Sequence, residues 1–218
     1  MRKLFARIRL FWALLRIRKN PGLTNYIFDI SDSLVELGLF EQTMNRVLLE
    51  PANLELIQKR TLLKPILLDH LMLLPEVSLG HQFARHMKKM NLDPLFYRLP
   101  EGETDIHYFL LRTRQTHDLW HIVTGFDISE GGEIGLQAFM MSHVQAPLSP
   151  ILVGGAVFRT GLDFPDKLIP LMELIVRGWI MGKTARGFFA YDWDSAWAKP
   201  LAQVRKELGL PEGIGFAS

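Results

Sequence analysis

Apolar residues recur every three or four positions along most of this 218-residue chain, and this spacing constrains the fold more than any other feature. It matches the period of an α-helix, in which such residues line one face. Runs in which β-branched and polar residues alternate, as half-buried strands require, are scarce. Hydrophobic residues make up 48% of the composition, enough for a substantial core. We therefore predict an all-α fold, a single-domain, multi-helix orthogonal bundle.

Proline and glycine divide the chain into helices, and Pro21-Gly22 is expected to end the first one. Residues 62–74 are strongly apolar but contain Pro65, which predicts a kinked helix at best. Residues 151–158 fit either a strand or a buried helix, and we favour the helix. The other predicted helices span residues 25–37, 40–49, 53–60, 79–90, 104–124, 133–144, 163–181 and 193–208.

The N-terminal segment is strongly basic, whereas the remainder of the chain has a net negative charge. Residues 1–19 hold seven basic residues and no acidic one; the remainder holds 18 basic and 23 acidic residues, a net charge of −5. Nucleic-acid binding requires a basic face on the domain itself, whereas here the basic residues are concentrated in the N-terminal segment and the remainder is acidic. We therefore expect no nucleic-acid partner. The segment fits an ordinary core helix, a helix on an anionic membrane surface, or a mitochondrial presequence, although it lacks serine. We divide the chain into residues 1–20, a basic amphipathic helix able to associate with a membrane, and residues 21–218, one all-α domain.

Four side chains form a candidate metal site. His117 and His121 lie four residues apart, so a helix stacks them one turn from each other, and Asp118 shares their arc. Glu133 can return to this arc from the following helix, because glycines in between allow the chain to reverse. Two imidazole nitrogens and two carboxylate oxygens suit Zn²⁺, Mn²⁺ or Fe²⁺. Alternatively, histidines meet this spacing by chance and the acids serve as caps or ion pairs.

The absence of cysteine limits the chemistry further. It excludes disulfides, thiolate metal sites, iron–sulfur clusters and a cysteine nucleophile.

The block from Arg112 to Glu133 resembles a family of ubiquinone (coenzyme Q) biosynthesis proteins. The hallmark of that family is His-Asp, two residues, His, eleven residues and Glu, and His117, Asp118, His121 and Glu133 fit it without departure. The flanking sequences THDLWHIVTG and GEIGLQAF are similar too, and the likeness covers most of residues 24–210. The resemblance implies an all-α protein that binds a divalent metal, zinc foremost, with magnesium, manganese or iron as alternatives. It also implies a peripheral position on the membrane where prenylated quinones are made.

Three further residues are candidates for substrate binding. Arg114 lies on the histidine arc and suits a substrate carboxylate or phosphate, or alternatively an ion pair with Asp118. Gln137 and Met140 share a helical stripe with Glu133 and fit an apolar cavity for a prenyl tail, although methionine at this spacing also suits a plain core. The uncharged stretch 134–158 contains prolines, so we favour a buried helix pair beside this lipid cavity over a membrane span. No catalytic residue is assigned.

Three functions remain open from these residues. The resemblance favours a metal-dependent lyase that removes the C1 carboxylate from a prenylated hydroxybenzoate. The alternative is a non-catalytic scaffold that binds prenyl lipid and organises the other quinone-biosynthesis proteins. The third is a metal phosphohydrolase whose ligands would be an upstream histidine (His81 or His86), the pair His117-Asp118 and a later acid, Asp163. It would leave His121 and Glu133 unexplained.

The resemblance also implies an oligomeric state and a cellular location. We expect a homo-oligomer at a membrane surface. Because the chain lacks the long leader of mitochondrial members, we expect a bacterial cytoplasmic location, with the matrix side of the mitochondrial inner membrane as the alternative.

Overall fold

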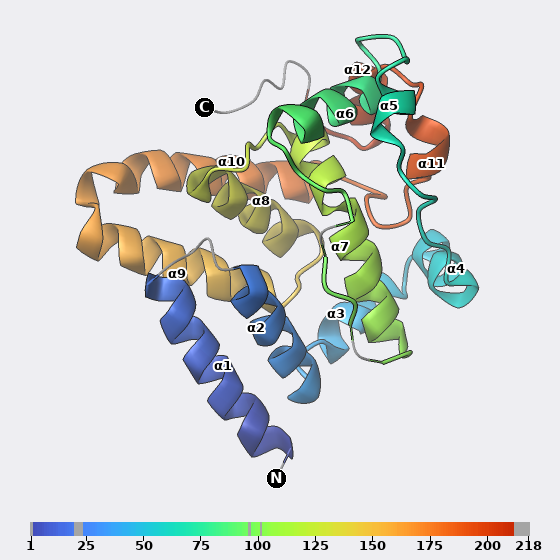
Figure 1. The fold of residues 1–218 in the computed structure, drawn as a ribbon. Helices are drawn as coiled ribbons and strands as arrows, with labels where there is room; N and C mark the ends of the chain where they lie inside the picture. Colours follow the sequence, from blue (N-terminus) through green and yellow to red (C-terminus); the bar gives the residue numbers. More distant parts are fainter. Residues whose placement is uncertain (1, 20–23, 96, 101, 212–218) are drawn as a thin grey trace. The chain divides into compact units, whose positions relative to one another are not determined.

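The computed structural model describes residues 2–19, 24–95, 97–100 and 102–211, and these residues form helices and no β-strand (Figure 1). The all-α prediction is therefore confirmed; the predicted break at Pro21-Gly22 lies outside the described residues. None of the described helices is long and apolar enough to cross a bilayer. The helices are α1 (Arg2–Lys19), α2 (Thr24–Glu36), α3 (Glu41–Val47), α4 (Pro51–Lys59), α5 (Leu68–Leu71), α6 (Leu79–Lys89), α7 (Asp105–Thr124), α8 (Glu130–His143), α9 (Leu148–Asp163), the 3₁₀ turn η1 (Pro165–Lys167), α10 (Leu168–Thr184), α11 (Trp193–Ala196) and α12 (Leu201–Glu207).

Prolines account for most differences from the predicted helices. Residues 61–67, which include Pro65, are not helical, and only the single turn of α5 forms in the apolar segment 62–74. Pro165 begins η1, so α10 begins at Leu168, whereas the predicted helix began at residue 163, which is the last residue of α9. Pro200 is the N-cap of α12 and divides the predicted helix 193–208. In each case the ring removes a backbone donor and disfavours helical geometry in the residue before it.

The helices form two compact units. One unit contains α1, α2, α3 and α8 to α10, and the other contains α4 to α7, α11 and α12. Each unit therefore combines two parts of the sequence that lie far apart along the chain.

In the first unit, α1 turns its small residues towards α2, and the two helices lie side by side (Figure 1). Ala6 and Ala13 are buried, while Arg9 donates hydrogen bonds from Nε to Ser33 Oγ at 2.8 Å and from Nη2 to Glu36 Oε1 at 2.9 Å. Most of the large apolar side chains of α1 are exposed instead. They are Leu4, Phe5, Ile8, Phe11, Trp12, Leu14 and Leu15.

Glycines allow α8 and α10 to approach closely within the same unit. A Cβ atom added at Gly178 would lie 2.1 Å from the carbonyl oxygen of Gly135, and one added at Gly182 would lie 2.3 Å from that of Phe139. Such distances are far shorter than any real contact, so only glycine fits at these positions. A cluster of buried apolar side chains completes the core beside this crossing: Ala138, Val153, Leu171 and Ile175.

The second unit is built around α7, whose buried residues include Phe109, Leu119 and Trp120. The C-terminal segment is tied down by a polar cluster, in which Lys199 Nζ donates to Glu207 Oε2 at 2.8 Å and Tyr191 Oη donates to the same oxygen. These hydrogen bonds lower the pKa of Glu207 to about 2. The cluster thus stabilises the ionised carboxylate and holds α12 in place.

The surroundings of two glycines predict that substitution by alanine changes the free energy of unfolding in opposite directions. Gly178→Ala should lower the free energy of unfolding by about 1–3 kcal/mol or more, because its methyl group meets the α8 backbone. Gly155→Ala on α9 meets open space and should raise it by about 0.5–1 kcal/mol through helix propensity. Urea denaturation followed by circular dichroism measures both; equal midpoints would contradict the close helix crossing.

Candidate metal centre

The two histidines of α7 face each other one turn apart. The Nε2 atoms of His117 and His121 are 3.1 Å apart, and the rings are nearly perpendicular. His121 is only 1% exposed, and its Nδ1 lies 3.0 Å from the carbonyl oxygen of Phe126. A carbonyl oxygen accepts only, so Nδ1 carries the proton and Nε2 keeps its lone pair. This arrangement of a ring nitrogen held by a backbone carbonyl is typical of histidine ligands.

Glu133 joins the histidines from the first turn of α8. Ser129 is the N-cap of that helix and accepts a hydrogen bond from the Gly132 amide at 3.1 Å. One ligand atom from each of His117, His121 and Glu133 lies within 4.8 Å of the other two. Helix α8 begins at Glu130, three residues earlier than predicted. Glu133 therefore lies within the first turn of the helix, and Gly131-Gly132 are helical as well. The reversal of the chain occurs before them.

Gly125 makes that reversal possible. It follows the last residue of α7 with a φ of 70°, in the left-handed region, and its amide donates to the carbonyl oxygen of His121 at 2.9 Å. Residues with a Cβ rarely adopt this conformation, so glycine is favoured at this position after a helix. The turn also brings the Phe126 carbonyl to the His121 ring.

The donor set fits a divalent metal. Two neutral imidazole nitrogens and one carboxylate oxygen are the ligands of many catalytic zinc sites, which leave a fourth position for water or substrate. Two nitrogens bound to one tetrahedral zinc ion are about 3.3 Å apart, close to the 3.1 Å between the two Nε2 atoms. The predicted fourth ligand, Asp118, is half-buried and is not part of the group of three.

Sequence reasoning did not identify Arg205, which contacts the C-terminal end of α7. Arg205, on α12, donates from Nε to the carbonyl oxygen of Val123 at 2.9 Å and from Nη2 to that of Ile122 at 3.0 Å. A cation at the C-terminus of a helix satisfies free carbonyl groups and interacts favourably with the helix dipole. Nothing in the linear sequence marks this pairing across more than 80 residues.

His86 on α6, one of the two upstream histidines that the phosphohydrolase alternative offered, lies near the centre. Burial lowers its pKa, and the nearby His121 lowers it further, while Asp118 opposes the shift. His86 therefore lies within electrostatic reach of two members of the predicted ligand set.

Two of the three predicted substrate residues have hydrogen-bond partners, and the third is buried. Arg114 donates from Nη1 to the carbonyl oxygen of Arg98 at 2.6 Å. Gln137 is buried, and its Oε1 accepts a hydrogen bond from Ser149 Oγ at 2.9 Å. Met140 is buried as well. A role of these residues in substrate binding remains a prediction.

Other histidines have ordinary structural surroundings. The Nδ1 of His81 lies 3.1 Å from the carbonyl oxygens of both Met72 and Leu74, and His107 is hydrogen-bonded to Thr104. His70 is exposed. None of the three belongs to the group of possible ligands among the described residues.

The geometry predicts that metal binding requires His117, His121 and Glu133, and that histidines elsewhere in the chain do not contribute. His117→Ala or Glu133→Ala should weaken binding of Zn²⁺ by more than about 100-fold, since each removes a direct ligand. His70→Ala, an exposed histidine outside the cluster, should leave binding unchanged. Metal titration with mass spectrometric metal analysis measures this, with far-ultraviolet circular dichroism as the folding control. Equal metal content in all three variants would contradict the site.

Comparison with known proteins places the chain in context. Residues 20–212 match the model of the family described as coenzyme Q (ubiquinone) biosynthesis protein Coq4. A crystal structure of a ubiquinone biosynthesis protein from Nostoc punctiforme aligns with a TM-score of 0.83 at 32% identity, covering 93% of this chain and 97% of that one.

Curated relatives carry similar names. The mitochondrial ubiquinone biosynthesis protein COQ4 homolog 1 of Culex quinquefasciatus is 29% identical over 64% of this chain and 50% of its own length. The mitochondrial COQ4 protein of Candida dubliniensis is 23% identical over 88% of this chain and 60% of its own length. The chain thus spans roughly half of the curated relatives that it matches. Since the family model covers nearly all of the described residues, the chain belongs to the Coq4 family of coenzyme Q (ubiquinone) biosynthesis proteins.

Proposed function

We propose that this chain is a metal-dependent protein of quinone biosynthesis that binds the polar head of a prenylated hydroxybenzoate and removes its C1 carboxylate. The observation that carries the proposal is the group formed by His117, His121 and Glu133 in a member of this family. In such a step the bond between the ring carbon and the carboxylate breaks, carbon dioxide leaves, and a proton takes its place on the ring.

The residues of the centre have distinct roles in this proposal. His117, His121 and Glu133 would hold the metal, zinc foremost, and Asp118 is the predicted further ligand. A bound divalent metal would supply a Lewis acid that stabilises negative charge on an oxygen of the head group. The Phe126 carbonyl holds the His121 ring in one tautomer, and Arg205 holds the carbonyl end of α7. These contacts keep the ligand nitrogens in place without the metal, so little reorganisation is needed on binding.

The exposed face of α1 supports a position on a membrane surface. Phe5 is 67% exposed and Trp12 57% exposed, although large apolar residues are usually buried. Lys3, Arg7 and Arg16 are exposed on the same helix, which has no acidic residue. An amphipathic helix with aromatic and basic residues binds anionic lipid surfaces through apolar burial and charge. We propose this role for α1 whether the membrane is bacterial, as the Nostoc relative suggests, or mitochondrial, as the names of the curated relatives suggest.

A non-catalytic scaffold that presents prenyl intermediates is the second candidate. It is favoured by the amount of exposed apolar surface, which extends beyond α1 to α10, where Ile169 is 67% exposed. Large exposed apolar surfaces often mark binding sites for proteins or membranes. In this function the metal would hold the head group only.

Turnover distinguishes the two functions. Metal-loaded protein should release labelled carbon dioxide from a carboxyl-labelled prenylated hydroxybenzoate in lipid vesicles, and Glu133→Ala should lower the rate by more than about 100-fold through loss of the metal. His70→Ala serves as the matched control and should retain the rate. Binding of the labelled substrate without release of carbon dioxide, with the other biosynthetic proteins supplied, would favour the scaffold and contradict the lyase.

Membrane association depends on α1 in this proposal. Replacing both Phe11 and Trp12 with Glu should reduce flotation with anionic phosphatidylglycerol vesicles by at least about tenfold, because two exposed aromatic side chains no longer insert into lipid. Leu49→Glu, which changes an 81% exposed leucine of the second unit, is the control and should float like the wild type. Binding should also weaken as salt is raised. Unchanged flotation of the α1 variant would exclude this helix as the membrane contact.

A further inference from the structure

The C-terminal end of α7 is held by one side chain from a distant part of the sequence. Helix α7 ends at Thr124, so the backbone amides that would continue its hydrogen bonding lie beyond the helix. The carbonyl oxygens of Ile122 and Val123 accept hydrogen bonds from Arg205, whose Nη2 donates to the first at 3.0 Å and whose Nε donates to the second at 2.9 Å. Both donors belong to one planar guanidinium, so this contact fixes the two carbonyl groups relative to each other.

The turn that follows carries the group that orients His121. It ends at Phe126, three residues after Val123, and the Phe126 carbonyl oxygen lies 3.0 Å from Nδ1 of His121. In between lies Gly125, which has a φ of 70°. Glycine adopts many backbone conformations with similar ease, so it permits this turn without enforcing it. Hydrogen bonds must therefore hold the turn in one shape, and those from Arg205 lie at its start.

Helix α12 is a fixed base for the Arg205 side chain. Val204, the residue before it, is fully buried, and the Leu210 amide donates to the Arg205 carbonyl oxygen at 2.9 Å. Two residues after Arg205, the Glu207 carboxylate accepts a hydrogen bond from Lys199 Nζ at 2.8 Å. The backbone on both sides of Arg205 is thus held within the second unit, to which α7 also belongs.

We propose that Arg205 is a positioning residue for the metal centre. By fixing residues 122–126 it keeps the Phe126 carbonyl against the His121 ring, and so keeps the ring proton on Nδ1. The inference rests on the proposed metal function. It extends that function to α12, a helix that contributes none of the three candidate ligands.

The position of the ring proton decides whether His121 can bind a metal. A neutral imidazole has one protonated nitrogen and one nitrogen with a free lone pair. With the proton on Nδ1, the lone pair lies on Nε2, the atom that is 3.1 Å from Nε2 of His117. If the Phe126 carbonyl moves away, the Nδ1 proton loses its acceptor and the tautomer with a proton on Nε2 becomes populated. That tautomer must lose or relocate this proton before the metal can bind, which lowers the affinity.

The tautomer can be read in the metal-free protein. With ¹⁵N-labelled histidine, long-range ¹H–¹⁵N NMR correlations show which ring nitrogen carries the proton, at a pH well above the ordinary pKa of imidazole. The spectrum of His121→Gln assigns the His121 signals. The wild type should carry the His121 proton on Nδ1 alone. Arg205→Met keeps a long unbranched side chain but has no donor, so it should populate the Nε2 tautomer as well.

Metal affinity gives the second readout. Arg205→Met should raise the dissociation constant for Zn²⁺ by about 10–100-fold, the usual effect of removing a group that orients a metal-binding histidine. Arg205→Lys keeps the charge but replaces the planar pair of donors by a single ammonium group, so its dissociation constant should lie between the two. If circular dichroism shows that Arg205→Met does not fold, Arg205→Lys carries the test, with a dissociation constant at least about threefold above the wild type.

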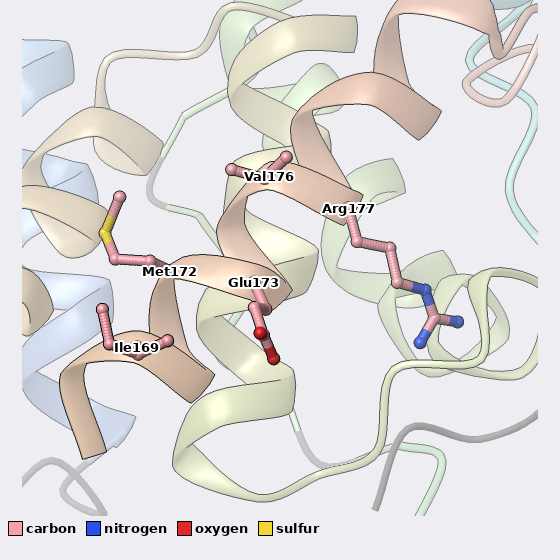
Figure 2. A pocket seen from close by; sticks show the side chains of 5 residues that line it. All are labelled: Ile169, Met172, Glu173, Val176 and Arg177. Atoms are coloured by element: carbon pink, nitrogen blue, oxygen red, sulfur yellow. The ribbon is translucent and has the colours of Figure 1, made fainter. Parts of the chain in front are cut away.

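Three controls separate positioning from a loss of charge or stability. Lys206→Met replaces the neighbouring exposed base of α12 in the same way. Glu173→Gln removes a charge from α10, where Figure 2 shows this side chain among those that line a shallow groove of about 380 Å³. Both should match the wild type in tautomer and affinity. Val204→Ala leaves a hole under α12 and should lower the urea midpoint, while the Zn²⁺ dissociation constant stays within about twofold of the wild type.

Three results would overturn the proposal. The first is a folded Arg205→Met variant that keeps the His121 proton on Nδ1 and binds Zn²⁺ like the wild type. The second is a Val204→Ala variant whose tautomer and affinity change as much as those of Arg205→Met, and the third is a wild type with the proton on Nε2. A wild type that binds no zinc would contradict the proposed function instead, and the tautomer experiment would still test the role of Arg205.

Discussion

The hydrogen bond between the His121 ring and the Phe126 carbonyl oxygen is the interaction on which the candidate centre depends. It requires the chain to turn back sharply after α7, which Gly125 allows through its left-handed conformation. It also leaves Nε2 of His121 facing His117 at 3.1 Å. Arg205 donates hydrogen bonds to carbonyl groups at the same helix end, so this end of α7 is held by side chain and backbone together.

Helices of the first unit present apolar residues both inwards and outwards. In α1 the small alanines face α2 and the aromatic residues face out. In α10, Ile169, Val176 and Ile180 are exposed, whereas Leu171 and Ile175 are buried. The basic residues beside the exposed aromatic residues of α1 are the physical reason for assigning a lipid surface to that helix.

Much of the candidate centre could be predicted from residue spacing. His117 and His121 must lie on one face because a helix advances one turn in four residues, and the glycines between the helices allow Glu133 to reach them. The spacing cannot decide whether Asp118 joins them, because a residue next to a ligand in sequence points along a different direction of the helix. Arg205 could not be found, since its proximity comes from packing of distant segments.

The sequence by itself determined the helical class, most helix positions and the spacing of the candidate metal ligands, because these follow from local periodicity and from proline and glycine. Only the tertiary structure decided which face of each helix is covered. The large apolar residues of α1 predict a core-facing stripe as well as a membrane-facing one, and the structure buries Ala6 and Ala13 instead. On α10, close approach to α8 at Gly178 selects the inner face and leaves Ile169, Val176 and Ile180 exposed. Periodicity describes a single helix, whereas burial depends on the neighbour that each face meets.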